Sequence, residues 1–112
     1  MPNAADVRTI ALSLPDAVEK ETWEHPTFRI RDKMFGAMAA DGSTANWKAT
    51  KDEQAALLAA SPEVYFVPPY VGHHGWVGVN LPLADPDELR ELIIEAWRMT
   101  APKRLVKTYD NP

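Results

Sequence analysis

Cysteine is absent from the sequence, and so are long apolar runs. Without cysteine the chain can form no disulfide bridge, thiolate metal site or thiolate nucleophile, and it suits a reducing compartment. No segment approaches the length that spans a bilayer. The first residues carry one early arginine and no apolar run, so they do not form a signal peptide. We therefore expect a cytoplasmic protein with no membrane partner.

Motifs of catalysis and nucleotide binding are missing too. There is no glycine-rich phosphate loop, because the short segment 41–43 (DGS) is typical of a hairpin turn. No Ser/His/Asp arrangement and no pair of catalytic carboxylates can be argued from the spacing. The sequence therefore predicts a protein that is not an enzyme and needs no cofactor.

Length and composition are those of an ordinary globular domain. The chain has 112 residues, of which 46% are hydrophobic and 25% charged. This is enough for one domain with a continuous core, and too little for two. We expect a single domain over residues 1–112, with a core from about 4 to 100 and a C-terminal tail, 101–112, whose last residues (KTYDNP) are loose.

The formal net charge of −4 counts against strong nonspecific DNA binding, since proteins that bind DNA through its phosphates are usually basic. The charge is unevenly distributed, however. Residues 52–95 hold eight acidic side chains and one basic one, whereas residues 28–51 hold five basic and two acidic ones. Residues 98–107 hold four bases and no acid. This unevenness leaves room for a local basic face.

Three helices are predicted, each with a capping residue at its start and a proline beyond its end. The first and third also have apolar residues at helical spacing, and the second begins with the capping-box pair Thr50 and Glu53. The caps are Asn3, Thr50 and Asp85, and the helices stop before Pro15, Pro62 and Pro102. The helix that follows Asp85 has the clearest pattern, because Pro86 occupies its first position and Glu88 stands three residues after the cap.

Between the helices the apolar residues alternate, which is typical of strands. The predicted strands cover residues 17–24, 27–31, 33–40, 44–50 and 75–81, with turns at HP, RDK and DGS. Connections this short join antiparallel neighbours, and residues 62–70 add an extended edge or loop segment. The order of elements predicts an α+β fold of two layers, an antiparallel sheet with helices on one face.

One face of such a sheet is left without helices, and alternation indicates which side chains it carries. If the apolar rows face the helices, the open face carries Arg29, Arg31, Asn46, Lys48, Trp76 and Asn80. These side chains either face solvent without a binding role or bind a partner. Trp76 is either covered by the preceding loop or used in binding, and a β-bulge near Gly75 or Gly78 would reverse the pattern and bury it.

The segment 67–77 (VPPYVGHHGWV) is predicted to be a structured loop that leads into the last strand. Its two prolines cannot donate to a sheet, and Gly72 and Gly75 supply flexible backbone. His73 and His74 are adjacent and have no Asp, Glu or Cys nearby, while His25 is far away in sequence. We therefore expect these histidines to form hydrogen bonds or contact a ligand, and we predict no metal site.

The segments LSLPDAVE, WEHPTFRIRDKMFG, NWKAT and YVGHHGWVGVNL, followed by an amphipathic helix, resemble in this order the MmcQ/YjbR-like family. The resemblance extends from about Val7 to Arg98. It implies a small bacterial α+β domain similar in fold to type III secretion chaperones, described as DNA-binding through a "double wing" of strands and hairpins. It places Lys48 and the GHHGW junction at positions typical of the family. Ala96-Trp97 departs from the pattern, since many relatives have a Ser-Tyr pair there.

The first hypothesis for function is weak, salt-sensitive binding of double-stranded DNA. Arg29, Arg31 and Lys48 would contact phosphates, and Trp76 or His74 would stack on bases or wedge between them. His73 belongs to the same candidate site, and Lys33 and residues 98–107 would add charge. Hairpins such as that at DGS would form the wings.

The alternative hypothesis is a module that binds a peptide, a protein or a small anionic ligand. Trp76 and the Pro68–Trp76 loop would form its surface, and a homodimer through the same surface is compatible with the fold. The two hypotheses differ in the residue that matters most. A DNA site depends on Lys48 or Arg29, whereas a peptide site depends on Trp76.

Overall fold

The computed structural model of the protein describes residues 2–112. An antiparallel sheet of six strands, in the order β1-β2-β3-β4-β6-β5, forms its centre. The strands are Ala17–Thr22 (β1), His25–Ile30 (β2), Lys33–Met38 (β3), Thr44–Trp47 (β4), Tyr65–Phe66 (β5) and Val77–Asn80 (β6). The α-helices are Ala4–Leu12 (α1), Lys51–Ala60 (α2), Pro86–Thr100 (α3) and Lys103–Asp110 (α4), and Gly72–His74 and Leu81–Leu83 form single 3₁₀ turns.

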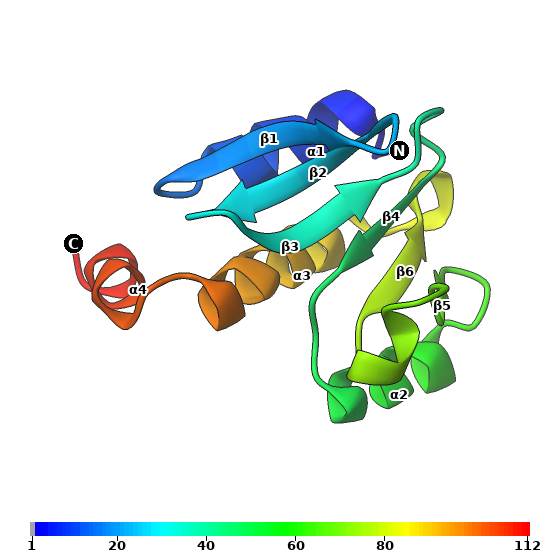
Figure 1. The fold of residues 1–112 in the computed structure, drawn as a ribbon. Coiled ribbons are helices and arrows are strands. Elements are labelled where there is room, and N and C mark those ends of the chain that lie inside the picture. Colours follow the sequence, from blue (N-terminus) through cyan, green and yellow to red (C-terminus); the bar gives the residue numbers. More distant parts are fainter. Residues whose placement is uncertain (1) are drawn as a thin grey trace.

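Helices α1 and α3 lie together on one side of the sheet (Figure 1). Helix α3 packs on β3 and β4, and α1 packs on β1 and on α3. Helix α2 lies beside the edge strand β5, and α4 follows the end of α3. The α+β fold class predicted from the sequence, with two layers and an open sheet face, is therefore confirmed.

The first three helices begin at the caps that the sequence predicts. The Asn3 side chain accepts a hydrogen bond from the Asp6 N–H, and the Asp6 carboxylate accepts one from the Asn3 N–H, each 3.0 Å long. The Thr50 hydroxyl and the Asp85 carboxylate each accept from the backbone N–H three residues later. These bonds satisfy N–H groups that a first helical turn leaves without partners, so they define where each helix starts.

The core between sheet and helices is built around two fully buried indoles, Trp47 from β4 and Trp97 from α3. The ring of Trp47 stacks on Phe28 with centroids 5.6 Å apart. It also lies directly on Gly36, where a β-carbon would come within 2.2 Å of the indole. Residue 36 is therefore glycine because the Trp47 ring occupies the space of a side chain.

A β-bulge in β3 changes which side chains face the core. Phe28 pairs with Gly36 but Arg29 pairs with Met34, so Phe35 is an extra residue in β3. Phe35 and Gly36 consequently both face the core, while Met34 faces the other side. In β6 the alternation is regular, with Val77 on the core side, so no bulge reverses the predicted pattern there.

Two element boundaries differ from those predicted. The first hairpin turns at Trp23-Glu24, because Thr22 pairs with His25 and β2 already begins there. The prediction had placed the turn at His25-Pro26. Helix α1 ends at Leu12, and Leu14 is buried in the turn that follows.

The C-terminal segment is a helix, so the prediction of a loose tail was wrong. Helix α4 places Leu105, Val106 and Tyr109 against the core. The Tyr109 ring lies 5.2 Å from the Trp97 ring, and Arg98 forms an ion pair of 2.5 Å with Asp110. The helix forms because its apolar side chains find a surface at the end of α3, which a local pattern of eight residues does not reveal.

Candidate functional site

One row of side chains crosses the open face of the sheet from edge to edge. Residues that pair across antiparallel strands point to the same side, and a chain of pairs links all six strands. The row consists of Lys20, Thr27, Ala37, Asn46, Gly78 and Phe66. At about 4.8 Å between strands it is about 24 Å long. Its central members are small, so it forms the floor of the open face.

A second row runs beside this floor and carries two of the predicted site residues. Arg29 follows Thr27 by two positions, and Lys48 follows Asn46 by two, so both lie on the same side of the floor. Trp76 precedes Gly78 by two on the antiparallel strand β6 and belongs to the same row. The strand register shows Arg29, Asn46 and Asn80 on the open face, as predicted. Lys48 and Trp76 lie one residue beyond β4 and β6, and continued alternation places both on the same side.

Arg31 does not join them. It lies in the two-residue turn between β2 and β3, with φ of 51°, and its guanidinium is 3.4 Å from the Asp16 carboxylate. The prediction assumed that β2 continues through residue 31. The strand ends at Ile30 because the chain reverses at Arg31-Asp32.

The acidic side chains of β1 point away from the open face. Glu19 pairs with Phe28 on the core side, and its carboxylate binds Arg8 of α1 at 2.9 Å. Glu21 lies on the same side of β1 as Glu19, whereas Lys20 lies on the open face. The strand positions of the open face therefore carry Lys20, Arg29 and Lys48 and no acidic residue, although the whole chain has a net charge of −4.

Arg29 is held in place by neutral acceptors. Its guanidinium donates to the Thr27 hydroxyl at 3.2 Å, to the Asp32 carbonyl oxygen at 3.2 Å and to the Thr22 hydroxyl at 3.4 Å. Among residues 2–112, four ion pairs occur, and none involves Lys20, Arg29 or Lys48. The positive charges of the open face therefore form no ion pair within the described residues, and Glu24 of the β1–β2 turn is an acidic residue that lies beside this face.

Trp76 is covered by the loop that precedes it, and only 8% of its side chain is exposed. The Gln54 amide of α2 fixes this loop by donating to the carbonyl oxygens of Gly72 at 2.8 Å and Trp76 at 2.5 Å. Gly75, with φ of 100°, allows the loop to approach the Ala49 carbonyl oxygen, 2.9 Å from where a β-carbon would stand. Of the two alternatives for Trp76, the structure shows the covered one.

His73 and His74 form an exposed 3₁₀ turn, with their ring centroids 3.9 Å apart. Neither ring lines a hollow of the open face.

Across residues 2–112, no three His, Asp or Glu side chains gather in a way that could hold a metal ion. No helix in this part of the chain has the length and apolar character needed to cross a membrane.

Two neighbouring hollows lie on the open face, and together they are called here the sheet groove. The first, of about 390 Å³, is lined by the β1–β2 turn, and the second, of about 250 Å³, by the loop before β6. They share His25, Ala37 and Asn46 as lining residues. Trp23 and Glu24 line the first hollow, and Tyr70 lines the second.

Trp23 and Tyr70 are the most exposed large hydrophobic side chains among the described residues, at 89% and 93%. Neither Trp23 nor Lys20 was predicted from the sequence as a site residue, and Tyr70 was predicted only as part of the loop. A signal for Trp23 exists in the sequence. Two alternating segments separated by the pair Trp-Glu indicate a two-residue hairpin turn, which exposes both residues.

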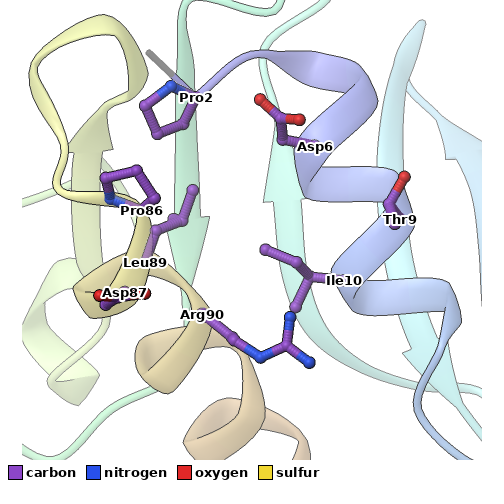
Figure 2. A pocket seen from close by; sticks show the side chains of 8 residues that line it. All are labelled: Pro2, Asp6, Thr9, Ile10, Pro86, Asp87, Leu89 and Arg90. Carbon is purple, nitrogen blue, oxygen red and sulfur yellow. The ribbon is translucent and has the colours of Figure 1, made fainter.

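The largest hollow, of about 410 Å³, lies elsewhere, between α1 and the start of α3. Figure 2 shows Ile10 and Leu89 between the two helices, with Asp6 and Arg90 at opposite sides of the opening. The Asp6 carboxylate already accepts a hydrogen bond from the Asn3 N–H. This hollow is the seam where two helices diverge, and no unsatisfied polar group within the described residues points to a ligand there.

Comparison with known proteins adds a family and a fold. The model of the YjbR family matches residues 12–99. A segment of 54 residues is 44% identical to the uncharacterized proteins Rv2570 of Mycobacterium tuberculosis and Mb2600 of Mycobacterium bovis, covering 48% of this chain and 42% of each relative. The crystal structure of Deinococcus radiodurans protein DR2400, a DUF419 domain, superposes with a TM-score of 0.82 at 19% identity, covering 100% of this chain and 91% of that chain.

Proposed function

The chain belongs to the YjbR family, as its sequence motifs indicated, and from that premise we propose that it binds DNA through the open face of its sheet. The observation that carries the proposal is the charge of this face. Lys20, Arg29 and Lys48 lie on it without carboxylate partners, while the acidic residues of β1 point to the helix side. A surface of this kind attracts the phosphates of a nucleic acid even when the whole protein is acidic.

Arg29 is the anchor of the proposed contact. Three neutral acceptors hold its guanidinium, so little side-chain entropy is lost when it binds a phosphate. Lys48 lies in the same row, two strands away, and supplies a second charge at about 10 Å. Phosphate contacts of this type position the DNA without reading its sequence.

The structure changes the residues assigned to this function. Arg31 is paired with Asp16, and Trp76 is covered, so neither is part of the proposed contact. His73 and His74 lie outside the sheet groove, and we assign them no role in it. No catalytic step is proposed.

Fluorescence anisotropy of labelled 20-nucleotide DNA, single-stranded and duplex, tests the proposal. Three phosphate contacts predict a slope of log K against log salt of about −2 to −3, which is roughly a twenty- to fortyfold loss of affinity between 50 and 200 mM salt. Lys48→Glu is expected to abolish binding. Arg90→Glu makes the same charge change on the exposed side of α3 and should affect binding little. If the folded wild type binds neither form at 50 mM salt, the proposal is wrong.

A second candidate is a small anionic ligand or an extended peptide in the sheet groove. The observation in its favour is the hollow of about 250 Å³ between the loop and the strands, lined by Trp76, Pro69 and Tyr70. Hollows of this shape with aromatic walls are typical of ligand sites. A peptide site would lose affinity on Trp76→Ala and keep it on Lys48→Gln, whereas the DNA site predicts the reverse. A second copy bound there would appear as a dimer in analytical ultracentrifugation.

A further inference from the structure

The two exposed aromatic residues of the sheet groove have unusual backbone conformations. Trp23 has φ of 52° and Tyr70 has φ of 67°, both in the left-handed region. Side chains with a β-carbon rarely adopt this region, and bulky ones are outliers there. A two-residue hairpin turn such as Trp23-Glu24 ordinarily prefers Asn-Gly. Large aromatics that are both strained and solvent-exposed do not stabilise the fold, which suggests that they serve binding.

Their positions relate them to one site. Trp23 lines the first hollow of the sheet groove and Tyr70 lines the second. The residues that the two hollows share include Ala37 and Asn46, which have small or short side chains. An exposed π-face beside each hollow and a shallow floor between them leave room for flat rings inside the groove.

We propose that the sheet groove binds single-stranded DNA in preference to duplex DNA, with unpaired bases stacked on Trp23 and Tyr70. The inference rests on the proposed function, since it uses the same phosphate contacts. Proteins that bind single strands combine a basic track for the backbone with aromatic side chains on which bases stack. Here Arg29 and Lys48 form a basic row beside the groove. The two aromatic side chains line its hollows.

Polar groups in the groove fit exposed base edges. The Asn46 amide offers a donor and an acceptor and lines both hollows. The His25 Nδ1 lies 3.2 Å from the Trp23 carbonyl oxygen, which ties the imidazole to the hairpin turn. These groups can hydrogen-bond to the Watson–Crick edge of a base only where that base is unpaired.

A duplex fits this site less well. Its bases are stacked inside the double helix, where neither Trp23 nor Tyr70 can reach their faces. A hairpin turn borders the groove on one side and a loop borders it on the other, so a rigid cylinder would rest on these rims. A flexible single strand can enter between them and follow the floor for a few nucleotides.

The experiment compares labelled oligo-dT of 12 nucleotides with a 12-base-pair duplex, measured by anisotropy at 50 mM salt with the full chain. The wild type is expected to bind the single strand at least tenfold more tightly. Trp23→Ala and Tyr70→Ala should each weaken this binding between about fivefold and a hundredfold. Leu83→Ala removes an exposed apolar side chain outside the groove and should leave the affinity unchanged. Trp23→Gly removes the same ring but relieves the backbone strain of the turn. If this variant also loses binding, the loss cannot be attributed to unfolding.

Two results would overturn the inference while leaving the proposed function intact. One is duplex binding as tight as single-strand binding. The other is single-strand affinity within twofold of wild type in both aromatic variants. Absence of binding to either form would overturn the proposed function together with the inference.

Discussion

The indole Nε1 of Trp97 donates a hydrogen bond of 3.0 Å to the backbone carbonyl oxygen of Pro15, 82 positions earlier in the chain. The bond ties α3 to the turn that follows α1, and the indole is fully buried. Trp47 is buried to the same degree, but its Nε1 has no hydrogen-bond partner within residues 2–112. Ala96 and Trp97 thus both belong to the core.

Replacing each indole by phenylalanine separates packing from hydrogen bonding. Trp97→Phe and Trp47→Phe remove similar volumes from the core, but only Trp97→Phe breaks a bond and leaves the Pro15 carbonyl oxygen without its donor. We expect Trp97→Phe to reduce the free energy of unfolding by about 1 kcal/mol more than Trp47→Phe. Urea denaturation followed by circular dichroism measures both. Equal losses would show that the bond contributes nothing net.

Gly36→Ala should be strongly destabilising. Its new β-carbon would stand 2.2 Å from the Trp47 ring, which is held between Phe28 and Phe35 and cannot move aside. Overpacking of this kind costs about 1–3 kcal/mol. Gly78→Ala is the matched comparison, because its β-carbon would meet the half-buried Phe66 ring on the edge strand, which can swing outwards. A melting temperature lowered more by Gly78→Ala than by Gly36→Ala would contradict this account.

Glu24→Gly should stabilise the protein. Glu24 has φ of 66° at the second position of a two-residue hairpin turn, where glycine carries no β-carbon penalty. We expect the free energy of unfolding, measured by thermal or urea denaturation, to rise by about 0.5–1 kcal/mol. This figure already allows for the greater conformational freedom of glycine in the unfolded chain. Glu21→Gly in the adjacent strand β1 should destabilise instead. If both substitutions change the free energy of unfolding in the same direction, the turn is not strained.

Stability at alkaline pH should depend on Tyr65. Burial, and secondly the hydrogen bond from its hydroxyl to Glu88 at 2.8 Å, raise the pKa of Tyr65 well above the usual value of about 10. The folded state keeps the proton while the unfolded chain loses it. The stabilisation is therefore complete below about pH 10 and is lost as the pH rises beyond it.

Urea midpoints at pH 8 and pH 11 test this linkage. Tyr65→Phe should be less stable than wild type at pH 8, because it lacks the hydrogen bond, but should lose less stability between the two pH values. Tyr70→Phe changes an exposed hydroxyl and should keep the wild-type pH dependence. Parallel pH profiles for wild type and Tyr65→Phe would rule out the linkage.

Much of the architecture is determined by the sequence alone. The caps Asn3, Thr50 and Asp85 lie where the helices start, because a cap and its N–H partner are only three residues apart. Alternation assigned Arg29, Asn46, Lys48 and Trp76 to the open face, since a strand repeats every two residues. These features depend on neighbours along the chain, and local patterns predict them.

Only the tertiary structure decided the composition of the site. It turned Arg31 towards Asp16, covered Trp76 with a loop fixed by Gln54, and folded residues 103–110 onto Trp97. It also brought Trp23 and Tyr70, 47 positions apart, to two neighbouring hollows of the open face. The register of six strands and the bulge at Phe35 create these relationships between distant segments. Their energies come from packing and pairing across the sheet, which no local pattern encodes.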